Sequence, residues 1–292
     1  MVNKMDLSII IVNWNVRDLL EKCLVSIFRE TKNIRFEVFV IDNASQDGSA
    51  EMVRSNFPEV KLINNKKNIG FAKANNQGIK EARGEFVLLL NPDTEIIESA
   101  IEKMVKFVEE NSKCGVAGCK LLNPDRTLQP SIKRFPTLFS QILILLKLHH
   151  LFPKLKPLRN YFALDFDYTQ EQEVDQVMGA FFLTRKEVLD KVGFLDENYY
   201  IWFEEVDFCR RVEDAGWKVC YSPRARIVHH KSQSFSQLLS FKKQRIFNRS
   251  LLYYFRKHHS FCAYLILLSL QPLSLFLARV TQLFGRPRVL KS

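Results

Sequence analysis

The chain has 292 residues, enough for one large core or for one core with an appended segment. Its composition is that of an ordinary globular protein, apart from 24 phenylalanines and a net charge of +11. Residues 215–292 hold 14 Lys or Arg and no Asp or Glu, so this basic quarter predicts an anionic partner: a membrane, a phosphate or a nucleic acid.

Strands and helices alternate over the first 121 residues. Apolar runs predict strands at 7–12, 36–41, 60–63, 86–90 and 116–121, and helical patterns predict helices at 16–30, 48–57, 71–82 and 99–110. This alternation predicts right-handed βαβ units and a parallel sheet. Asn13 and Asn15 interrupt the first apolar run, which argues against a signal peptide.

The regular alternation of predicted strands and helices ends after residue 122. Residues 123–172 hold five prolines and an apolar run at 138–152, which is too short to span a bilayer and predicts an interfacial or buried helix. Further strands are expected at 174–184 and 218–221, with a short strand after Pro223, and helices at 186–192 and 203–215. A basic helix is expected at 236–259 and an apolar helix at 262–284, interrupted at Gln271-Pro272. The six cysteines show no zinc-binding spacing and are interpreted as free thiols in a reducing cytosol.

The stretch from Gly84 to Thr94 holds the most informative motif. Its five consecutive apolar residues predict a strand buried on both faces, and Pro92 ends that strand. Asn91 and Asp93 therefore lie at the carboxyl end of a central strand, where open α/β sheets bind their ligands. We predict that Asp93 holds a metal ion that binds the diphosphate of a nucleotide-sugar.

Other polar residues follow the neighbouring strands. Asp42 and Asn43 end the second strand at a position that contacts nucleotides, although a helix cap plus turn is the favoured explanation when they are taken alone. Trp14 and Asn15 end the first strand, and the indole is either a stacking plate for a base or part of the core. Two more amides in the next loop and helix start are Asn68 and Asn75. The chain has no Gly-x-Gly-x-x-Gly or P-loop, which argues against a dinucleotide enzyme or an ATPase.

A cluster of acids opens the helix expected at 203–215. Favourable charge at a helix N-terminus and an i,i+4 pair with Arg211 explain Asp207 well, but they leave Glu204 and Glu205 as two adjacent carboxylates at the edge of aromatic surroundings. Glu205 points to a different face beside aromatic residues, where desolvation can raise its pKa toward that of a general base. His229 ends a later strand and is predicted as a second metal ligand.

The basic helix carries a stripe of cations. Lys242, Arg249 and Arg256 recur every seven residues and so line one face, with Arg245 nearby, which suits anionic lipid headgroups or an acceptor diphosphate. We favour a monotopic attachment to the membrane for the apolar helix that follows; an oligomer contact is the alternative. Long aliphatic runs between the cations argue against nucleic-acid binding.

Together these motifs resemble the family 2 glycosyltransferases of the GT-A fold, in their rhamnosyltransferase-like bacterial branch. The matching stretches, in order, are Ser8–Asn15, Val40–Gly48, Asn68–Asn76, Leu90–Thr94, Gly179–Ala180, Phe203–Phe208, Ala215–Trp217 and Pro223–His230. The resemblance implies an α/β fold of the nucleotide-diphospho-sugar transferase type: a single mixed, mainly parallel sheet flanked by helices. It implies a catalytic domain at 1–230, with a nucleotide-binding half at 1–120 and an acceptor half at 121–230. Residues 231–292 are then a helical, basic and apolar membrane-associating segment.

The resemblance also implies roles for single residues. The counterpart of Asp42 contacts the nucleotide base, and an aromatic residue at the position of Trp14 packs against that base. Asp93 belongs to an Asp-x-Asp metal motif whose first acid is an amide here, and Glu205 is the catalytic base. His229 contacts the metal or the diphosphate. The remaining donor-binding positions are Asn15, Asn43, Asn68, Asn75 and Asn91.

We therefore expect an inverting transferase, dependent on Mg²⁺ or Mn²⁺, that moves L-rhamnose from dTDP-L-rhamnose to a polyprenyl-diphosphate-linked glycan in cell-surface polysaccharide assembly. It is expected in the cytoplasm, peripheral to the inner face of the plasma membrane, with a homo-oligomer as a further option. The alternatives are another donor, UDP-N-acetylglucosamine or UDP-galactofuranose, or a catalytically silent nucleotide-sugar-binding subunit. A glycosidase also needs two carboxylates, but it has no use for a nucleotide-type sheet edge or a metal.

Overall fold

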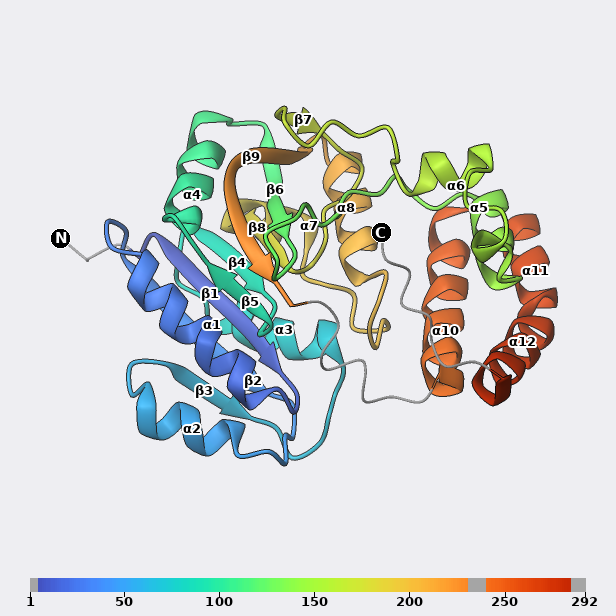
Figure 1. Cartoon of the computed structure of the whole chain (residues 1–292). Coiled ribbons are helices and arrows are strands. Elements are labelled where there is room, and N and C mark those ends of the chain that lie inside the picture. Colours follow the sequence, from blue (N-terminus) through green and yellow to red (C-terminus); the bar gives the residue numbers. More distant parts are fainter. Residues whose placement is uncertain (1–4, 231–239, 285–292) are drawn as a thin grey trace.

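The computed structural model describes residues 5–230 and 240–284 (Figure 1). Its strands form one mixed sheet in the order β3-β2-β1-β4-β8-β6-β9-β5, with β7 paired to β9. The strands are β1 Leu7–Asn13, β2 Phe36–Asp42, β3 Lys61–Asn64, β4 Phe86–Leu90, β5 Thr94–Ile96, β6 Cys114–Leu122, β7 Gln172–Glu173, β8 Phe181–Arg185 and β9 Lys218–His229. Parallel pairing joins β3, β2, β1 and β4 and also joins β6 to β9, whereas β8, β5 and β7 run antiparallel to their partners. The expected single, mixed and mainly parallel sheet is confirmed.

Helices cover both faces of this sheet. They are α1 Arg17–Glu30, α2 Ser49–Asn56, α3 Phe71–Glu81, α4 Ala100–Glu110, α5 Leu138–Leu145, η1 Leu148–His150, α6 Lys156–Tyr161, α7 Lys186–Val192, α8 Glu204–Asp214, α10 Ser240–His258, α11 Phe261–Ser269 and α12 Gln271–Phe284. Ile9 and Ile11 of β1 pack with α1, α2 and α4, while Ile10 packs with α3, α7 and α8 on the other face. This alternation is that of a strand buried on both sides.

The sequence prediction fails in two strands. The strand expected at 174–184 begins only at Phe181, because Val177 crosses over the face of β6, where a Cβ on Gly118 would lie 2.7 Å from it. The strand expected to end at Tyr221 continues as β9 to His229. Cys119 pairs with Ser222 and Lys120 with Arg226, so the residues around Pro223 form a bulge within one long strand.

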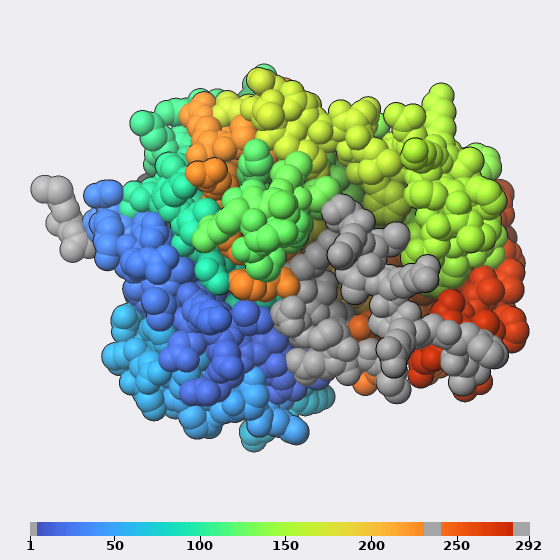
Figure 2. Space-filling model, viewed as in Figure 1, coloured from blue at the N-terminus to red at the C-terminus, as the bar shows by residue number. Residues whose placement is uncertain are grey.

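The C-terminal helices form a block at one end of the molecule. Figure 2 shows the red C-terminal helices next to the yellow-green segment that includes α5 and α6, and α5 contacts α11. The first residues of the expected basic helix, 236–239, lie outside the described residues; α10 begins at Ser240. The expected apolar helix is two helices, α11 and α12, which meet at Leu270 next to the predicted interruption.

A separate hydrophobic cluster joins this block to the rest of the chain. Leu251, Tyr254 and Phe255 of α10 are buried together with Tyr199 and Phe203, which precede α8. Figure 1 shows α10 on the side of α8 that faces away from β6. The division of the chain at residue 230 stays a prediction, because α10 packs directly onto the loop that leads into α8.

Candidate active site

A cavity of about 700 Å³ lies where the carboxyl ends of the central strands meet α10. β1 separates β2 from β4, so the strand order reverses here, and this is the switch point at which open α/β sheets bind ligands. Seven of the ten predicted site residues line the cavity: Trp14, Asn43, Asn68, Asn91, Asp93, Glu205 and His229.

The other three predicted residues support the loops around the cavity. Asp42 is buried, and its carboxylate accepts hydrogen bonds from Asn13 Nδ2 and Ser45 N, both at 2.9 Å. The Asn15 side chain accepts from Gln46 N at 2.7 Å. The buried amide of Asn75 donates to the Phe71 carbonyl at 3.0 Å, one turn earlier in α3. Asn15, Asp42 and Asn75 do not line the cavity, and their predicted contacts with a donor remain predictions.

An amide network shapes the end of the cavity that lies next to β2 and α3. Asn43 Nδ2 donates to Asn68 Oδ1 at 3.1 Å and to the Gly70 carbonyl at 3.2 Å. The Tyr200 hydroxyl donates to Asn68 Oδ1 at 2.9 Å, and the Tyr200 carbonyl accepts from Phe71 N at 2.7 Å. The loop before α8 is thereby attached to the start of α3, so two halves of the chain meet across one rim.

Asp93 and His229 meet because β5 pairs with β9. Thr94 is paired with His229, and His230 N donates to the Asp93 carbonyl at 2.8 Å. This pairing brings His229 Nε2 within 3.3 Å of Asp93 Oδ1. Both side chains are buried, with only 4% of His229 and 6% of Asp93 exposed.

Gln129 fixes the orientation of the imidazole. Its amide nitrogen donates to Asn123 Oδ1 at 2.9 Å and to the His229 carbonyl at 3.1 Å, so its oxygen faces His229 Nδ1 at 2.7 Å. In a neutral imidazole, Nδ1 then carries the proton and donates to Gln129, and the lone pair of Nε2 faces Asp93. Nε2 has no hydrogen-bond partner among the described residues. Two electron-pair donors that face each other in a buried site fit a cation, and a hydrogen bond from the second ring nitrogen is typical of a metal-bound histidine.

The start of α8 supplies a pair of carboxyl groups, of which Glu204 is buried and Glu205 is half-buried. Burial raises the pKa of Glu204, and the charge of Glu205 raises it further. Burial also raises the pKa of Glu205, although backbone hydrogen bonding and the charge of Lys133 oppose this shift. One oxygen of each carboxyl group lacks a hydrogen-bond partner among the described residues. Of the two, Glu205 is the one that Lys133 keeps closer to its ionised form, as a general base requires.

Strained backbone turns surround this cavity. Trp202 and Phe203, directly before Glu204, have φ values of +64° and +71°, and Asn15 and Ala44 follow β1 and β2 with φ of +52° and +65°. Residues other than glycine rarely adopt the left-handed backbone region of positive φ, and those that do cluster at functional sites.

A buried ion cluster anchors α10 to α8. The predicted pair of Asp207 with Arg211 is present at 2.8 Å, and Asp207 also contacts Lys257 and His258 of α10, both at 2.7 Å. Lys257 contacts Asp196 as well, at 2.8 Å. Asp207 is therefore an anchor of the C-terminal helices and does not line the cavity.

Sequence reasoning missed several residues of the site. Lys133 lies in the proline-rich segment, and Gln129 reaches His229 from a loop, with no motif around either residue. Tyr200 belongs to a recognisable aromatic run, but its role at the rim depends on contact with Asn68. Lys242 and Arg249, which the sequence assigned to a basic stripe, line the cavity itself.

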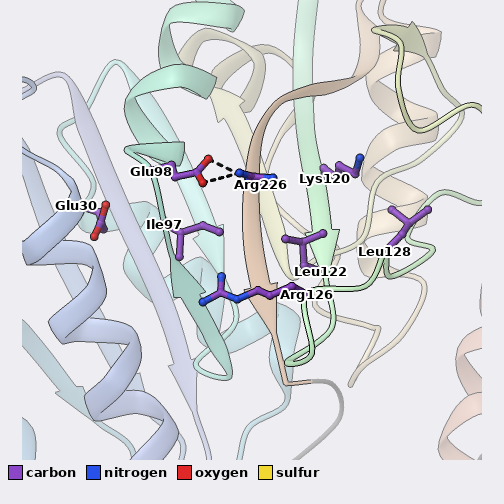
Figure 3. Close-up of a pocket in the computed structure, with 8 residues that line it drawn as sticks. All are labelled: Glu30, Ile97, Glu98, Lys120, Leu122, Arg126, Leu128 and Arg226. Atoms are coloured by element: carbon purple, nitrogen blue, oxygen red, sulfur yellow. Dashed lines mark hydrogen bonds and ion pairs between the residues drawn. The ribbon is translucent and has the colours of Figure 1, made fainter.

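A second hollow of about 660 Å³ lies beside β5 and β9 (Figure 3). Its walls carry opposite charges that pair with each other, since Arg226 makes two contacts with Glu98 at 2.6 and 3.0 Å. None of the predicted site residues lines it, so the cavity at the switch point is the candidate site.

The fold and the cavity define a glycosyltransferase of the GT-A class. The model of the family described as glycosyl transferase family 2 matches residues 8–193, and the chain belongs to that family. The chain is 26% identical over 239 residues to the N-acetylglucosaminyl-diphospho-decaprenol L-rhamnosyltransferase of Mycobacterium tuberculosis, covering 78% of this chain and 77% of the relative. It is 27% identical over 212 residues to the low-salt glycan biosynthesis hexosyltransferase Agl10 of Haloferax volcanii, covering 70% of this chain and 61% of the relative.

Solved structures confirm the fold. The mannosyltransferase PcManGT from Pyrobaculum calidifontis, in complex with GDP-Man and Mn²⁺, superimposes with a TM-score of 0.59 at 17% identity, covering 98% of this chain and 77% of that protein. GalNAc-T7 with UDP, GalNAc and Mn²⁺ gives a TM-score of 0.58 at 17% identity, covering 78% of this chain. This chain spans 44% of the length of GalNAc-T7.

Proposed function

We propose that this chain is an inverting, metal-dependent glycosyltransferase that moves a sugar from a nucleotide-sugar to a lipid-linked glycan. The observation that carries the proposal is that one cavity at the switch point holds Asp93, His229 and Glu205 together. The mycobacterial relative, named as a rhamnosyltransferase with a diphospho-decaprenol acceptor, favours L-rhamnose from dTDP-L-rhamnose as the donor sugar.

The donor is proposed to bind along the edge made by β1 and β2. Trp14 is half-buried in the cavity wall and offers a flat surface for a base, while Asn43, Asn68 and Asn91 offer amide groups to the nucleotide. Asp42 positions the loop that carries Asn43.

Asp93 and His229 are the proposed protein ligands of Mg²⁺ or Mn²⁺. Among residues 5–230 and 240–284 no group of three or more His, Cys, Asp or Glu forms a metal cluster, so the donor phosphates would complete the ligand set. A cation bound there would neutralise the charge of the departing nucleotide diphosphate. Both structural neighbours named above contain Mn²⁺ together with a nucleotide or nucleotide-sugar.

Glu205 is the proposed base. Its raised pKa lets it accept a proton from an acceptor hydroxyl as that oxygen attacks the anomeric carbon. Attack from the face opposite the leaving diphosphate inverts the anomeric centre in one displacement, and the base and the metal ligands therefore belong on opposite sides of the sugar.

The C-terminal helices are proposed to attach the enzyme to the cytoplasmic face of the plasma membrane. Residues Phe261–Gln282 are long and apolar enough to cross a membrane, with a mean hydropathy of 1.9, and α11 and α12 expose Phe261, Leu265 and Phe276. Phe139 and Leu151 are exposed in the neighbouring segment. Residues 231–292 would then form the membrane-associating segment beside a catalytic domain at 1–230; contact between two copies of the chain is the alternative.

The test is a screen of nucleotide-sugars for metal-dependent thermal stabilisation, followed by turnover with a polyprenyl-diphosphate acceptor. Glu205→Gln should bind the donor normally and lose turnover by roughly 10²–10⁴-fold, whereas Glu213→Gln, on the same helix outside the cavity, should stay active. Asp93→Ala should lose the metal dependence of donor binding. Unchanged turnover in Glu205→Gln contradicts its role as base, and donor binding without turnover in the native chain indicates a silent binding subunit.

A further inference from the structure

Two cations of α10 lie in the wall of the cavity that holds the candidate base. Lys242 and Arg249 line it together with Ile246 and Ser250, which lie on the same helical face. Lys133 reaches the same cavity from the segment after β6. Arg256 continues the stripe but does not line the cavity. Only the part of the stripe that holds Lys242 and Arg249 therefore lies beside the candidate base.

Two of these cations, Lys242 and Arg249, lack carboxylate partners in the part of the chain that the structure describes. Neither Lys242 nor Arg249 forms an ion pair there, although Lys257 of the same helix contacts both Asp196 and Asp207. The cavity also holds the carboxyl groups of Asp93, Glu204 and Glu205, and the charge of Lys133 acts on Glu205. Lys242 and Arg249 are the two cations left without an ion pair among the described residues, and together they fit a ligand with two negative charges.

The cations belong to the side of the cavity where the base lies. Ser250 Oγ donates to the Ile201 carbonyl at 2.8 Å, and the ring of Phe247 lies 6.0 Å from that of Trp202 and 5.6 Å from that of Phe203. These contacts attach α10 to the turn that presents Glu205. The donor diphosphate, by contrast, is assigned to Asp93 and His229. An anion held by α10 thus approaches from the side of the incoming acceptor.

The same helices offer an apolar surface next to this charge. α10 contacts both α11 and α12, whose exposed side chains include Phe261 and Phe276, 69% and 61% exposed. Figure 1 shows α11 and α12 on the far side of α10 from the sheet. A lipid diphosphate has both complementary parts: its diphosphate fits the cations in the cavity, and its apolar chain fits the exposed surface of α11 and α12.

We propose that Lys242 and Arg249, with Lys133, form a subsite for the diphosphate of a polyprenyl-linked acceptor. The proposal rests on the proposed function only in naming the bound molecule as the acceptor. A free phosphate or an anionic lipid headgroup shares part of this chemistry, and the measurements below separate these sources.

The experiment measures binding of farnesyl diphosphate to the full chain by calorimetry, with farnesyl monophosphate and phosphatidylglycerol vesicles as comparison probes. Lys242→Gln with Arg249→Gln should weaken farnesyl diphosphate binding by roughly 100-fold and each single change by roughly 10-fold, because a hydrogen bond to a charged group is lost in each case. Arg256→Gln is the matched control: it lies about 10 Å further along the same stripe and should bind normally. Both changed side chains are exposed, so the unfolding temperature should be unaffected.

Several outcomes overturn the proposal. Unchanged farnesyl diphosphate binding in the double variant contradicts the proposal. Arg256→Gln that weakens this binding as much as the other changes also contradicts it, because the effect is then a general attraction to the basic surface. Loss of nucleotide-sugar binding with normal farnesyl diphosphate binding assigns the cations to the donor. Loss of vesicle binding alone assigns them to lipid headgroups. If no nucleotide-sugar supports turnover but farnesyl diphosphate binding still depends on Lys242 and Arg249, the proposed function fails and the subsite stands.

Discussion

Replacing Gln129 by Leu should weaken metal binding although Gln129 does not line the cavity. Its oxygen accepts from His229 Nδ1 at 2.7 Å, and its nitrogen donates to the His229 carbonyl at 3.1 Å. Leucine removes both contacts at a residue that is 1% exposed. The imidazole loses the partner that sets its proton on Nδ1 and turns Nε2 toward Asp93.

The size of the effect follows from these contacts. Loss of an orienting partner of a metal-bound histidine typically costs 10–100-fold in metal affinity, which is about 1.4–2.7 kcal/mol. The Nδ1–H group and the carbonyl of His229 also lose buried partners, at about 1–3 kcal/mol each, so the free energy of unfolding falls as well. Gln129→Glu keeps an acceptor at Nδ1 and should retain metal affinity better than Gln129→Leu.

The assay titrates Mn²⁺ in the presence of a nucleoside diphosphate and follows the rise in unfolding temperature, which reports the dissociation constant without requiring turnover. His229→Ala is measured in parallel as the variant that removes the ligand itself. The reasoning is refuted if Gln129→Leu binds Mn²⁺ like the native chain while His229→Ala does not.

Three further predictions concern proton equilibria and backbone shape. Because burial raises the pKa of Glu205 and Lys133 lowers it, activity should fall as pH falls through that raised pKa. Lys133→Gln should move this acid limb to higher pH, and a move to lower pH contradicts the assignment. For Asp207, burial alone would raise the pKa, but hydrogen bonds from His258 and Lys257 and the charge of Arg211 outweigh it and lower the pKa. The contribution of Asp207 to the free energy of unfolding is therefore fully present above its pKa in the unfolded chain, about 3.9. It is lost as the pH falls through the lowered pKa in the folded chain. Asp207→Ala should cost about 3–5 kcal/mol at pH 7 and much less at pH 2 in urea unfolding; equal losses at both pH values argue against the ion cluster. Gly70→Ala places a Cβ 2.6 Å from a backbone oxygen of the loop before α8, at φ +91°. It should destabilise the chain more than Gly216→Ala, which has a similar φ with no atom within 4 Å and should cost about 1–2 kcal/mol; equal unfolding temperatures would show that the loop yields freely.

Much of the fold and part of the site could be predicted from local sequence patterns. The buried run before Pro92 placed Asp93 at the end of β4, and the alternation of elements predicted the edge that also carries Trp14 and Asn43. The bounds of α7, Lys186–Val192, agree with the pattern. The start of β8 and the length of β9 were predicted wrongly, because hydrophobic periodicity does not report how segments cross or where a strand bulges. Val177 is buried because it crosses over Gly118, and Pro223 lies in a bulge of β9.

The sequence by itself determined which residue types end the central strands, because strand ends follow from apolar runs and from proline, which are local properties. The class of chemistry was predicted from the resemblance of several motifs to the family 2 glycosyltransferases. Only the tertiary structure decided which of those residues meet. The antiparallel pairing of β5 with β9 brings His229 to Asp93, and Gln129 reaches the imidazole from a separate loop. Packing of α10 against the start of α8 turns a basic stripe into part of the cavity wall. These contacts depend on strand register and helix packing between distant segments, which no local pattern encodes.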